Sequence, residues 1–379
     1  MPARRRANRE GSIWQRQDGR WTGAAYVLTT AGTFRRAYVY GQTRDEVHAR
    51  LVQLQDRSAR GVPLPDHAWT VGKYLDYWLE HIARPAIRPT TYAKYEVFIR
   101  LYLRPGLGRH RLDRLSAATV QSWLNGRLAA GDSVAKVQVM RRVLAAALTR
   151  AMREELISRN VARLATLPPE RPTRLQPWSV AEARAFLHAA RRDPLYPALV
   201  LLLVYGLRRG EVLGLSWNDV DLDQEVIRIR QQLFRVSGRL QLGPVKTAAG
   251  RRDLPLLGIA RDALIRQASL RVIGANSHEW TARDLIFTTR TGRPVEPRNL
   301  ARSFERITVK ARLRPIRLHD LRHTAATLLK DLGVPARDTM DILGHTRIAV
   351  TMEVYTGADN ASRREAIGKL SALFGGDPE

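Results

Sequence analysis

The stretch that organises the chain lies near its C-terminus, where residues 315–356 read PIRLHDLRHTAATLLKDLGVPARDTMDILGHTRIAVTMEVYT. It contains His319, Arg322 and His323 within five residues, then His345, and then Tyr355 ten residues later. On a helix, His319 and Arg322 share one face, with His323 one step further round. An imidazole can carry a proton near neutral pH, and a guanidinium presents paired donors that match phosphate oxygens. This helical face therefore predicts chemistry on a phosphate.

Tyr355 adds a hydroxyl that can attack a phosphate and form a covalent intermediate when a neighbouring group accepts its proton. Two other interpretations stay open for single residues. A tyrosine near a helix end commonly packs half-buried. His319 and His323, four residues apart, could instead form a metal-binding pair.

The composition indicates a polyanionic partner. The 379 residues include 63 Lys and Arg against 36 Asp and Glu, a formal charge of +27 and a pI near 11.3. Nucleic acid is favoured over membrane, because no run of about 18 apolar residues is present. The basic cluster at residues 4–9 precedes no apolar segment, so we expect no signal peptide and a cytoplasmic location. The absence of cysteine excludes disulfides, thiol nucleophiles and cysteine-based zinc sites.

The length predicts two or three domains. Residues 11–40 contain three short β-rich runs, the last two separated by a turn at 30–32, and Thr43 with Glu46 forms a capping box that begins a helix. We therefore predict a three-strand-plus-helix module over residues 1–62, including its basic N-terminal tail. Proline-containing residues 61–67 form a first linker.

A helical pattern fills the middle of the chain. Its first apolar stripe contains Val71, Tyr74, Leu75 and Trp78. We predict an all-α domain over residues 68–165, followed by a proline-rich linker at 166–178.

The last domain, residues 179–379, begins at a capping box formed by Ser179 and Glu182. It is expected to be mainly helical, with a buried helix at 198–205 and a later helix at 297–313. β-type runs in it predict a small antiparallel sheet and a separate buried strand; they lie at residues 225–230, 240–245, 252–256 and 285–288. The predicted fold class is thus multidomain α+β.

The chain resembles the tyrosine recombinases of the phage integrase family. The resemblance rests on H-x-L-R-H at 319–323, L-G-H at 343–345, the spacing to Tyr355, and G-L-R-R-G-E-V-L-G-L-S-W at 206–217. It covers most of the chain, is strongest over residues 200–356, and points to an actinobacterial-type phage or integrative-element integrase.

The resemblance implies a catalytic set and a carboxylate that orients it. The set is Arg208, Lys246, His319, Arg322, His345 and the nucleophile Tyr355, supported by Glu211. Arg209 is the rival of Arg208, and the family spacing from Gly206 favours Arg208.

Lys246 lies in V-K-T-A-A-G-R-R-D-L-P-L, which resembles the family's lysine hairpin and places this lysine at its tip. Only seven of the 63 basic residues are lysine, and lysine can be tuned to release a proton whereas arginine cannot. A surface lysine present by chance stays an alternative.

The reaction implied by the resemblance begins when Tyr355 attacks a phosphodiester, leaving a 3′-phosphotyrosine and a free 5′-hydroxyl. Two arginines, Arg208 and Arg322, would clamp the charged oxygens, and His345 would hydrogen-bond the phosphate. His319 would take the tyrosine proton, and Lys246 would protonate the departing oxygen. No metal or other cofactor is expected, because the covalent bond conserves the phosphodiester energy.

The expected partner is double-stranded DNA at attachment sites, bound by a homotetramer at the bacterial nucleoid. An excisionase and a host DNA-bending protein are further candidate partners. The N-terminal module would bind arm sites, and the helical domain would clamp DNA. The candidate DNA contacts are Arg35, Arg36, Arg141, Arg142 and Arg150. The C-terminal tail would pack on a neighbouring protomer or on its own domain.

Three alternatives accompany this interpretation. A type IB topoisomerase uses similar chemistry, but the N-terminal module and the tail favour recombination. A DNA-binding protein that has lost activity would not need the full catalytic set. A metal-dependent nuclease would use His319, His323 and His345 as ligands and would fail in a chelator.

Overall fold

The computed structural model describes residues 11–29, 33–60, 69–170, 176–272 and 284–355. For Tyr355 it describes the backbone but not the side chain. Several predicted features lie outside the described residues: the N-terminal arginines, the turn at 30–32, the first linker, part of the second and the C-terminal tail. The chain forms two compact units, Met1–Arg171 and Pro172–Glu379, so their boundary falls inside the segment 166–178.

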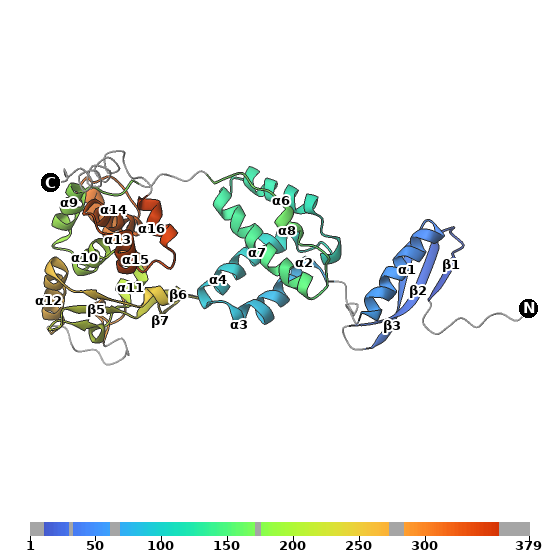
Figure 1. Cartoon of the computed structure of the whole chain (residues 1–379), viewed down its shortest axis with the longest axis horizontal. Helices are drawn as coiled ribbons and strands as arrows, with labels where there is room; N and C mark the ends of the chain where they lie inside the picture. Colours follow the sequence, from blue (N-terminus) through green and yellow to red (C-terminus); the bar gives the residue numbers. More distant parts are fainter. Residues whose placement is uncertain (1–10, 30–32, 61–68, 171–175, 273–283, 356–379) are drawn as a thin grey trace, which may run out of the picture. The chain divides into compact units, whose positions relative to one another are not determined.

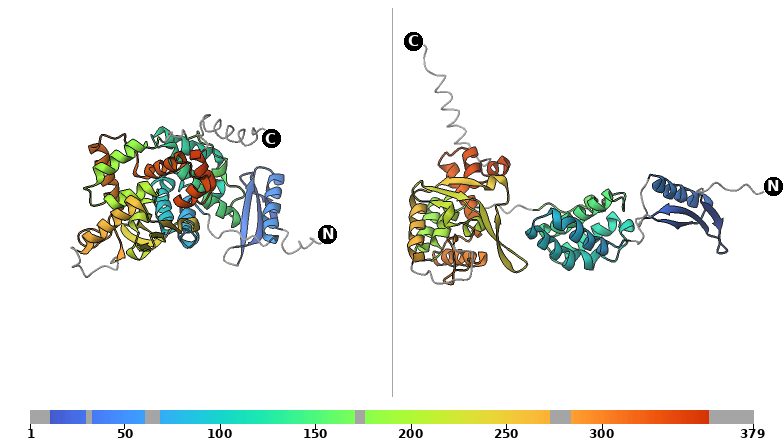
Figure 2. Two further views of the ribbon diagram at one scale, coloured as in Figure 1. Left: turned by 60° about the vertical axis from the view of Figure 1, so that its left-hand side comes forward. Right: turned by 90° about the horizontal axis from the view of Figure 1, so that it is seen from below.

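The N-terminal module is a three-stranded antiparallel sheet in the order β1-β2-β3, with a helix along one face (Figure 1, Figure 2). Its elements are β1 (Ser12–Gln15), β2 (Trp21–Leu28), β3 (Phe34–Gly41) and α1 (Arg44–Ala59). Helix α1 begins where predicted, because the Thr43 hydroxyl accepts a hydrogen bond from the Glu46 backbone at 3.2 Å. Val47 and Leu51 of α1 are buried, whereas several strand aromatics are exposed; these are Trp14, Tyr26, Phe34, Tyr38 and Tyr40.

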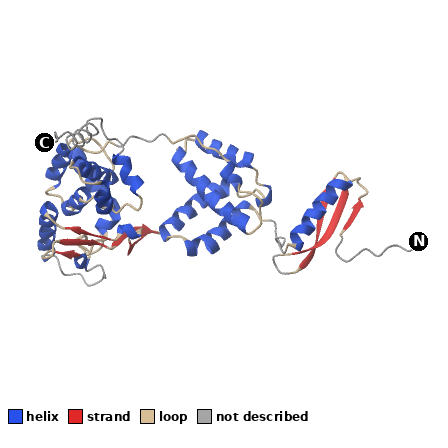
Figure 3. Cartoon of the chain, in the orientation of Figure 1, coloured by secondary structure: helices blue, strands red, loops and turns tan. Residues whose placement is uncertain are grey.

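The middle of the chain is helical throughout its described residues (Figure 3). Its α-helices are α2 (Val71–Tyr77), α3 (Arg84–Ala86), α4 (Pro89–Phe98), α5 (Arg104–Leu107), α6 (Ala117–Ala129), α7 (Val134–Arg153) and α8 (Val161–Leu164), with π-helical turns at Trp78–Ala83 and Ile99–Leu103 and a 3₁₀ turn at Leu112–Arg114. The predicted stripe from Val71 to Trp78 is buried in one apolar core with the inner face of α7. Its aromatic rings therefore serve packing.

The second unit combines helices with two small sheets. Its helices are α9 (Val180–Ala190), α10 (Tyr196–Val204), α11 (Arg209–Leu213), α12 (Gly258–Val272), α13 (Pro297–Lys310), α14 (Leu321–Asp331), α15 (Ala336–Leu343) and α16 (Ile348–Tyr355), with 3₁₀ turns at Trp217–Asp219, Ala248–Gly250 and Leu318–Asp320. One antiparallel sheet contains β4 (Val220–Asp221), β5 (Val226–Ile229) and β8 (Arg252–Pro255), and a hairpin contains β6 (Gln231–Val236) and β7 (Arg239–Pro244). Helix α10 is buried over residues 196–203 and packs against α12 and α14.

The core of this unit begins at Trp178, inside the segment predicted as linker. The Trp178 ring packs against Phe186 and Phe304 at centroid distances of 5.1 and 5.6 Å. Its indole N–H donates to the Arg314 carbonyl at 3.0 Å, and its backbone N–H donates to Thr324 at 3.1 Å. The hydrogen bond to Thr324 joins the start of the unit to helix α14.

One sequence-based expectation for this unit is wrong. Residues 285–287 are buried, but Leu285 and Thr288 form only single bridges to Ser216 and Pro294, and a proline cannot donate to a continuing ladder. Lys246 follows β7 and lies in the connection that leads to β8. The strands were foreseen better than their pairing.

No helix in the described part of the chain has the length and apolar character needed to cross a membrane.

Candidate active site

The turn after α10 brings Arg208 into a polar network and leaves Arg209 exposed. Gly206 has a left-handed φ of +58°, and α11 begins directly after Arg208. The Arg208 backbone N–H and Nη1 donate to the two Glu211 carboxylate oxygens at 3.1 and 2.6 Å. Arg209 lies at the surface. The two candidate arginines thus differ in their surroundings: Arg208 belongs to the polar network, and Arg209 is exposed.

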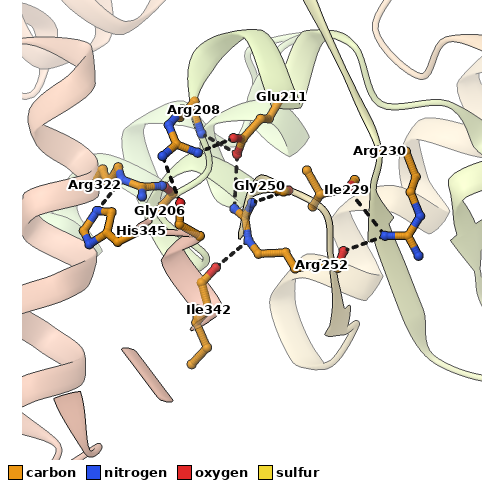
Figure 4. A network of polar contacts seen from close by, with 11 residues as sticks. Gly206, Arg208, Glu211, Ile229, Arg230, Gly250, Arg252, Arg322, Ile342 and His345 are labelled. Atoms are coloured by element: carbon orange, nitrogen blue, oxygen red, sulfur yellow. Dashed lines mark hydrogen bonds and ion pairs between the residues drawn. The ribbon is translucent and has the colours of Figure 1, made fainter. Parts of the chain in front are cut away.

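Glu211 is 2% exposed and is shared by a second arginine, Arg252 on β8 (Figure 4). Arg252 Nη2 donates to Glu211 at 3.1 Å, and its Nε donates to the Ile342 carbonyl at 2.7 Å. Burial alone would raise the pKa of Glu211, but the charges of Arg252 and Arg208 outweigh it and lower that pKa. Glu211 therefore stays ionised and holds two guanidinium groups.

Arg252 is absent from the set inferred from sequence. The alternation along β8 was a usable signal, because Leu254 and Leu256 are buried and Arg252 lies two residues earlier on the same side of the strand. An arginine in the same alternation as these leucines points inward with them. A charge buried in this way requires a partner. Glu211 is that partner.

Arg322, on α14, is only 5% exposed and lies next to Arg208 (Figure 4). Its Nη1 donates to the Gly206 carbonyl at 2.7 Å, and Arg208 Nη2 donates to the Gly344 carbonyl at 3.0 Å. Each arginine thus donates to the backbone carbonyl of a glycine that belongs to a different sequence motif. Burial, helped by the positive charge of Arg208, lowers the pKa of Arg322 to about 9. Among the described residues, nothing accepts a hydrogen bond from Arg322 Nη2, although this nitrogen is buried.

His345 lies between Arg322 and helix α16. Its Nε2 is 3.2 Å from Arg322 Nε, and its Nδ1 is 2.8 Å from the Thr351 hydroxyl. Burial and the nearby positive charge of Arg322 lower the pKa of His345 to about 4, so its ring is neutral at pH 7. Thr351, which the sequence interpretation did not single out, is fully buried at this contact.

His319 and Arg322 do not lie on one continuous α-helix, contrary to the prediction. His319 belongs to the 3₁₀ turn Leu318–Asp320, which precedes α14. Its ring meets His323 edge-on at a centroid distance of 6.1 Å. His319 is an exposed residue. Desolvation of its ring by the surrounding protein, together with the charge of Arg322, nevertheless lowers the pKa of His319.

The two remaining members of the predicted set are not brought into this network by the described contacts. Lys246 is exposed in the connection between β7 and β8. Tyr355 ends helix α16, and its side chain is outside the description. The described residues also contain no group of three or more His, Cys, Asp or Glu side chains that could hold a metal ion.

The candidate DNA contacts differ in availability. Arg35, Arg36 and Arg142 are exposed, and the Arg36 guanidinium lies 5.6 Å from the centroid of the Tyr38 ring. Arg141 and Arg150 make hydrogen bonds within the helical part of the chain. Arg141 donates to the Ala165 carbonyl at 2.7 Å, and Arg150 donates to Glu154 at 2.6 Å.

Comparisons with known proteins identify the class. The family model described as "Phage integrase family" matches residues 179–362, and the model described as "Phage integrase, N-terminal SAM-like domain" matches residues 70–128. Integrases of Saccharopolyspora erythraea and Streptomyces ambofaciens are 26% and 27% identical to this chain. The match covers 98% of both chains for the first and 93% of both for the second.

Solved structures show the same fold. The Tn1549 transposon integrase in complex with a circular intermediate DNA superposes with a TM-score of 0.71 at 24% identity, covering 79% of this chain and 99% of that one. A lambda integrase tetramer bound to a Holliday junction superposes with a TM-score of 0.57 at 20% identity, covering 92% and 96%. The family and sequence matches identify a site-specific recombinase of the tyrosine class. The two family models together match well over half of the chain, and the chain belongs to the phage integrase family.

Proposed function

We propose that this recombinase cuts and rejoins double-stranded DNA at attachment sites through Tyr355, and that it integrates and excises a phage or other mobile element. The observation that carries the proposal is a cluster of three arginines beside one carboxylate: Arg208 and Arg252 both pair with Glu211, and Arg322 lies next to Arg208. Two guanidinium groups share the charge of Glu211, and a buried nitrogen of Arg322 has no acceptor among the described residues. An anion with several acceptor oxygens, such as a DNA phosphate, would satisfy that nitrogen and balance the charge.

In the proposed cleavage step the Tyr355 oxygen forms a bond to phosphorus, and the bond between phosphorus and the 5′-oxygen breaks. His319 accepts the tyrosine proton, which its lowered pKa permits because the ring is neutral at pH 7. Lys246 supplies a proton to the 5′-oxygen. Arg208 and Arg322 stabilise the charge that develops on the non-bridging oxygens.

Lys246 would act from the connection between β7 and β8. His345 Nε2 faces Arg322 and its Nδ1 faces Thr351, so His345 supports an arginine of the proposed phosphate site.

The domain roles and the assembly are part of the proposal. Residues 1–62 would bind arm sites through the exposed face that carries Arg35 and Arg36, and residues 68–165 would bind the core site. The solved relatives support this, since the Tn1549 protein is in complex with DNA and the lambda protein is a tetramer on a Holliday junction. We expect a homotetramer on DNA, with an excisionase and a host DNA-bending protein as additional partners.

The test is covalent capture of DNA. A nicked suicide duplex carrying the attachment core of the element is incubated with the full chain in EDTA and run on a denaturing gel. We expect a protein–DNA band from wild type that disappears in Tyr355→Phe, because a phenyl ring has no oxygen to bond phosphorus. Tyr205→Phe is the matched control in the same unit, since the Tyr205 hydroxyl donates to the Pro255 carbonyl at 2.7 Å and should leave the band in place.

The other outcomes separate the alternatives. A band that persists in Tyr355→Phe would assign the nucleophile elsewhere. Absence of any band on DNA that the wild type binds would favour a DNA-binding protein without activity. Cleavage that requires a divalent metal and stops in EDTA would favour a nuclease using His319, His323 and His345.

A further inference from the structure

A chain of side chains connects the helix that ends in Tyr355 to the most buried arginine of the site. Helix α16 runs from Ile348 to Tyr355 and packs against α14 and α15. Thr351 precedes Tyr355 by four residues, about one helical turn. Its hydroxyl contacts His345 Nδ1 at 2.8 Å, and His345 Nε2 contacts Arg322 Nε at 3.2 Å. Arg322 in turn donates to the Gly206 carbonyl at 2.7 Å.

The directions of these hydrogen bonds follow from the groups involved. A guanidinium only donates, so His345 Nε2 must be the acceptor from Arg322. A neutral imidazole with Nε2 as acceptor carries its proton on Nδ1, and this proton is donated to the Thr351 oxygen. Burial and the Arg322 charge keep the ring neutral by lowering the pKa of His345 to about 4. Valine at position 351 would remove the only oxygen of this side chain while preserving its shape.

We propose that Thr351 is a positioning residue: its oxygen accepts the Nδ1–H of His345, holds this ring in place and thereby orients Arg322. The proposal rests on the proposed function in one respect, the role of Arg322 at the phosphate. Because Thr351 belongs to α16, this support reaches the Nε side of Arg322 only when the helix is docked, whereas the Gly206 carbonyl holds Nη1 from another element. Docking of the helix that carries Tyr355 therefore completes the phosphate clamp.

The physical reason is the cost of a buried donor without an acceptor. Arg322 already fixes the tautomer, because its Nε–H requires Nε2 as an acceptor. Without the Thr351 oxygen, the His345 Nδ1–H would lose its partner in this contact, and the ring would turn away to find another. Arg322 already has one buried nitrogen without an acceptor among the described residues. Loss of the Nε contact as well would leave its Gly206 bond as the main restraint on the group, and its free nitrogen would no longer have a defined direction.

The first test reads the hydrogen bond of the His345 Nδ1–H directly. The full chain is labelled with ¹⁵N-histidine, and the His345 signals are assigned by their loss in His345→Gln. Long-range ¹H–¹⁵N spectra at pH 7 are expected to show a slowly exchanging Nδ1–H in wild type and in Thr351→Ser, and its loss by exchange with water in Thr351→Val. An Nδ1–H signal unchanged in Thr351→Val would overturn the proposal. This measurement needs no catalysis, so its result is independent of whether Tyr355 is the nucleophile.

The second test measures the rate of covalent complex formation at saturating suicide substrate. Support for a histidine by a hydrogen bond is typically worth about 10- to 100-fold in activity in metal sites, and we expect a similar loss for Thr351→Val with unchanged DNA affinity. Thr351→Ser should stay within about threefold of wild type, because it retains the hydroxyl. A serine variant as slow as the valine variant would overturn the proposal, since it would assign the effect to packing.

Thr308→Val is the matched control. Thr308 is buried on α13, and its hydroxyl donates to the Phe304 carbonyl of the same helix at 2.9 Å. The replacement removes a buried hydroxyl from the same unit without touching the arginine network. We expect the rate and the His345 Nδ1–H signal of this variant to match wild type, and an equal loss of rate in both valine variants would contradict a specific role for Thr351.

Discussion

Arg322→Lys is expected to slow covalent complex formation by about 10²- to 10³-fold while DNA binding stays close to wild type. The guanidinium of Arg322 spans the Gly206 carbonyl and His345 and still has a buried nitrogen available. A lysine ammonium is a single point of charge and cannot hold both of these groups and a phosphate oxygen in a fixed plane. The measurement is the single-turnover rate at saturating suicide duplex, with affinity determined separately by gel shift.

Arg209→Lys is the matched control for this loss. Arg209 is an exposed arginine beside Arg208 and makes no described contact with Glu211. Its replacement by lysine keeps the charge, so we expect the rate at saturation to change by less than about threefold. A large loss in Arg209→Lys, with little change in Arg322→Lys, would mean that the phosphate is bound on a different surface from the one formed by the buried arginine.

Glu211→Gln is expected to lower the free energy of unfolding by about 3–5 kcal/mol at pH 7. The amide has the shape of the carboxylate but no charge, so Arg208 and Arg252 lose the only carboxylate that contacts them in the described structure. Breaking one side of a buried ion pair leaves an uncompensated charge, and Arg252 is nearly as buried as Glu211. Urea denaturation of both proteins at pH 7 measures the difference.

The pH dependence of that difference has a defined sign. The pKa of Glu211 is lowered in the folded protein, so the unfolded chain binds the proton more readily. The stability that the carboxylate contributes is fully present above its unfolded pKa of about 4.3 and is lost as pH falls through the lower folded pKa. The gap between wild type and Glu211→Gln should therefore narrow below about pH 4.

A surface carboxylate provides the comparison for Glu211. Glu96 pairs with Arg100 one turn later on the exposed side of the helical part, at 2.6 Å. Glu96→Gln should leave the unfolding transition nearly unchanged at every pH, because exposed ion pairs contribute little. A destabilisation by Glu96→Gln as large as that by Glu211→Gln would show that burial does not set the value of the ion pairs in this protein.

Local features could be predicted because the interacting residues are close in the chain. The capping box that begins α9 joins Ser179 and Glu182, and both of its bonds are present at 3.2 and 2.8 Å. The same reasoning foresaw the start of α1 at Thr43 and the burial of α10. Strand pairing was not predictable in this way. Residues 240–245 were foreseen as a strand of one short sheet, but they pair with β6 in a separate hairpin, and β6 was not foreseen.

The sequence by itself determined the family, through short motifs whose residues act together: Arg208 with Glu211 in one turn, the group from His319 to His323, and Tyr355 ten residues after His345. It also determined where α1, α9 and α13 begin, since caps and apolar periodicity depend on residues within one or two turns.

Only the tertiary structure decided how these motifs support one another. Arg208 donates to Gly344 and Arg322 to Gly206, across 136 and 116 residues, and Arg252 on β8 joins them through Glu211. Such contacts join groups distant in sequence, and their strength depends on burial that the fold as a whole creates. The place of the His345 ring is set in the same way, because Arg322 and Thr351 reach its two nitrogens from different helices.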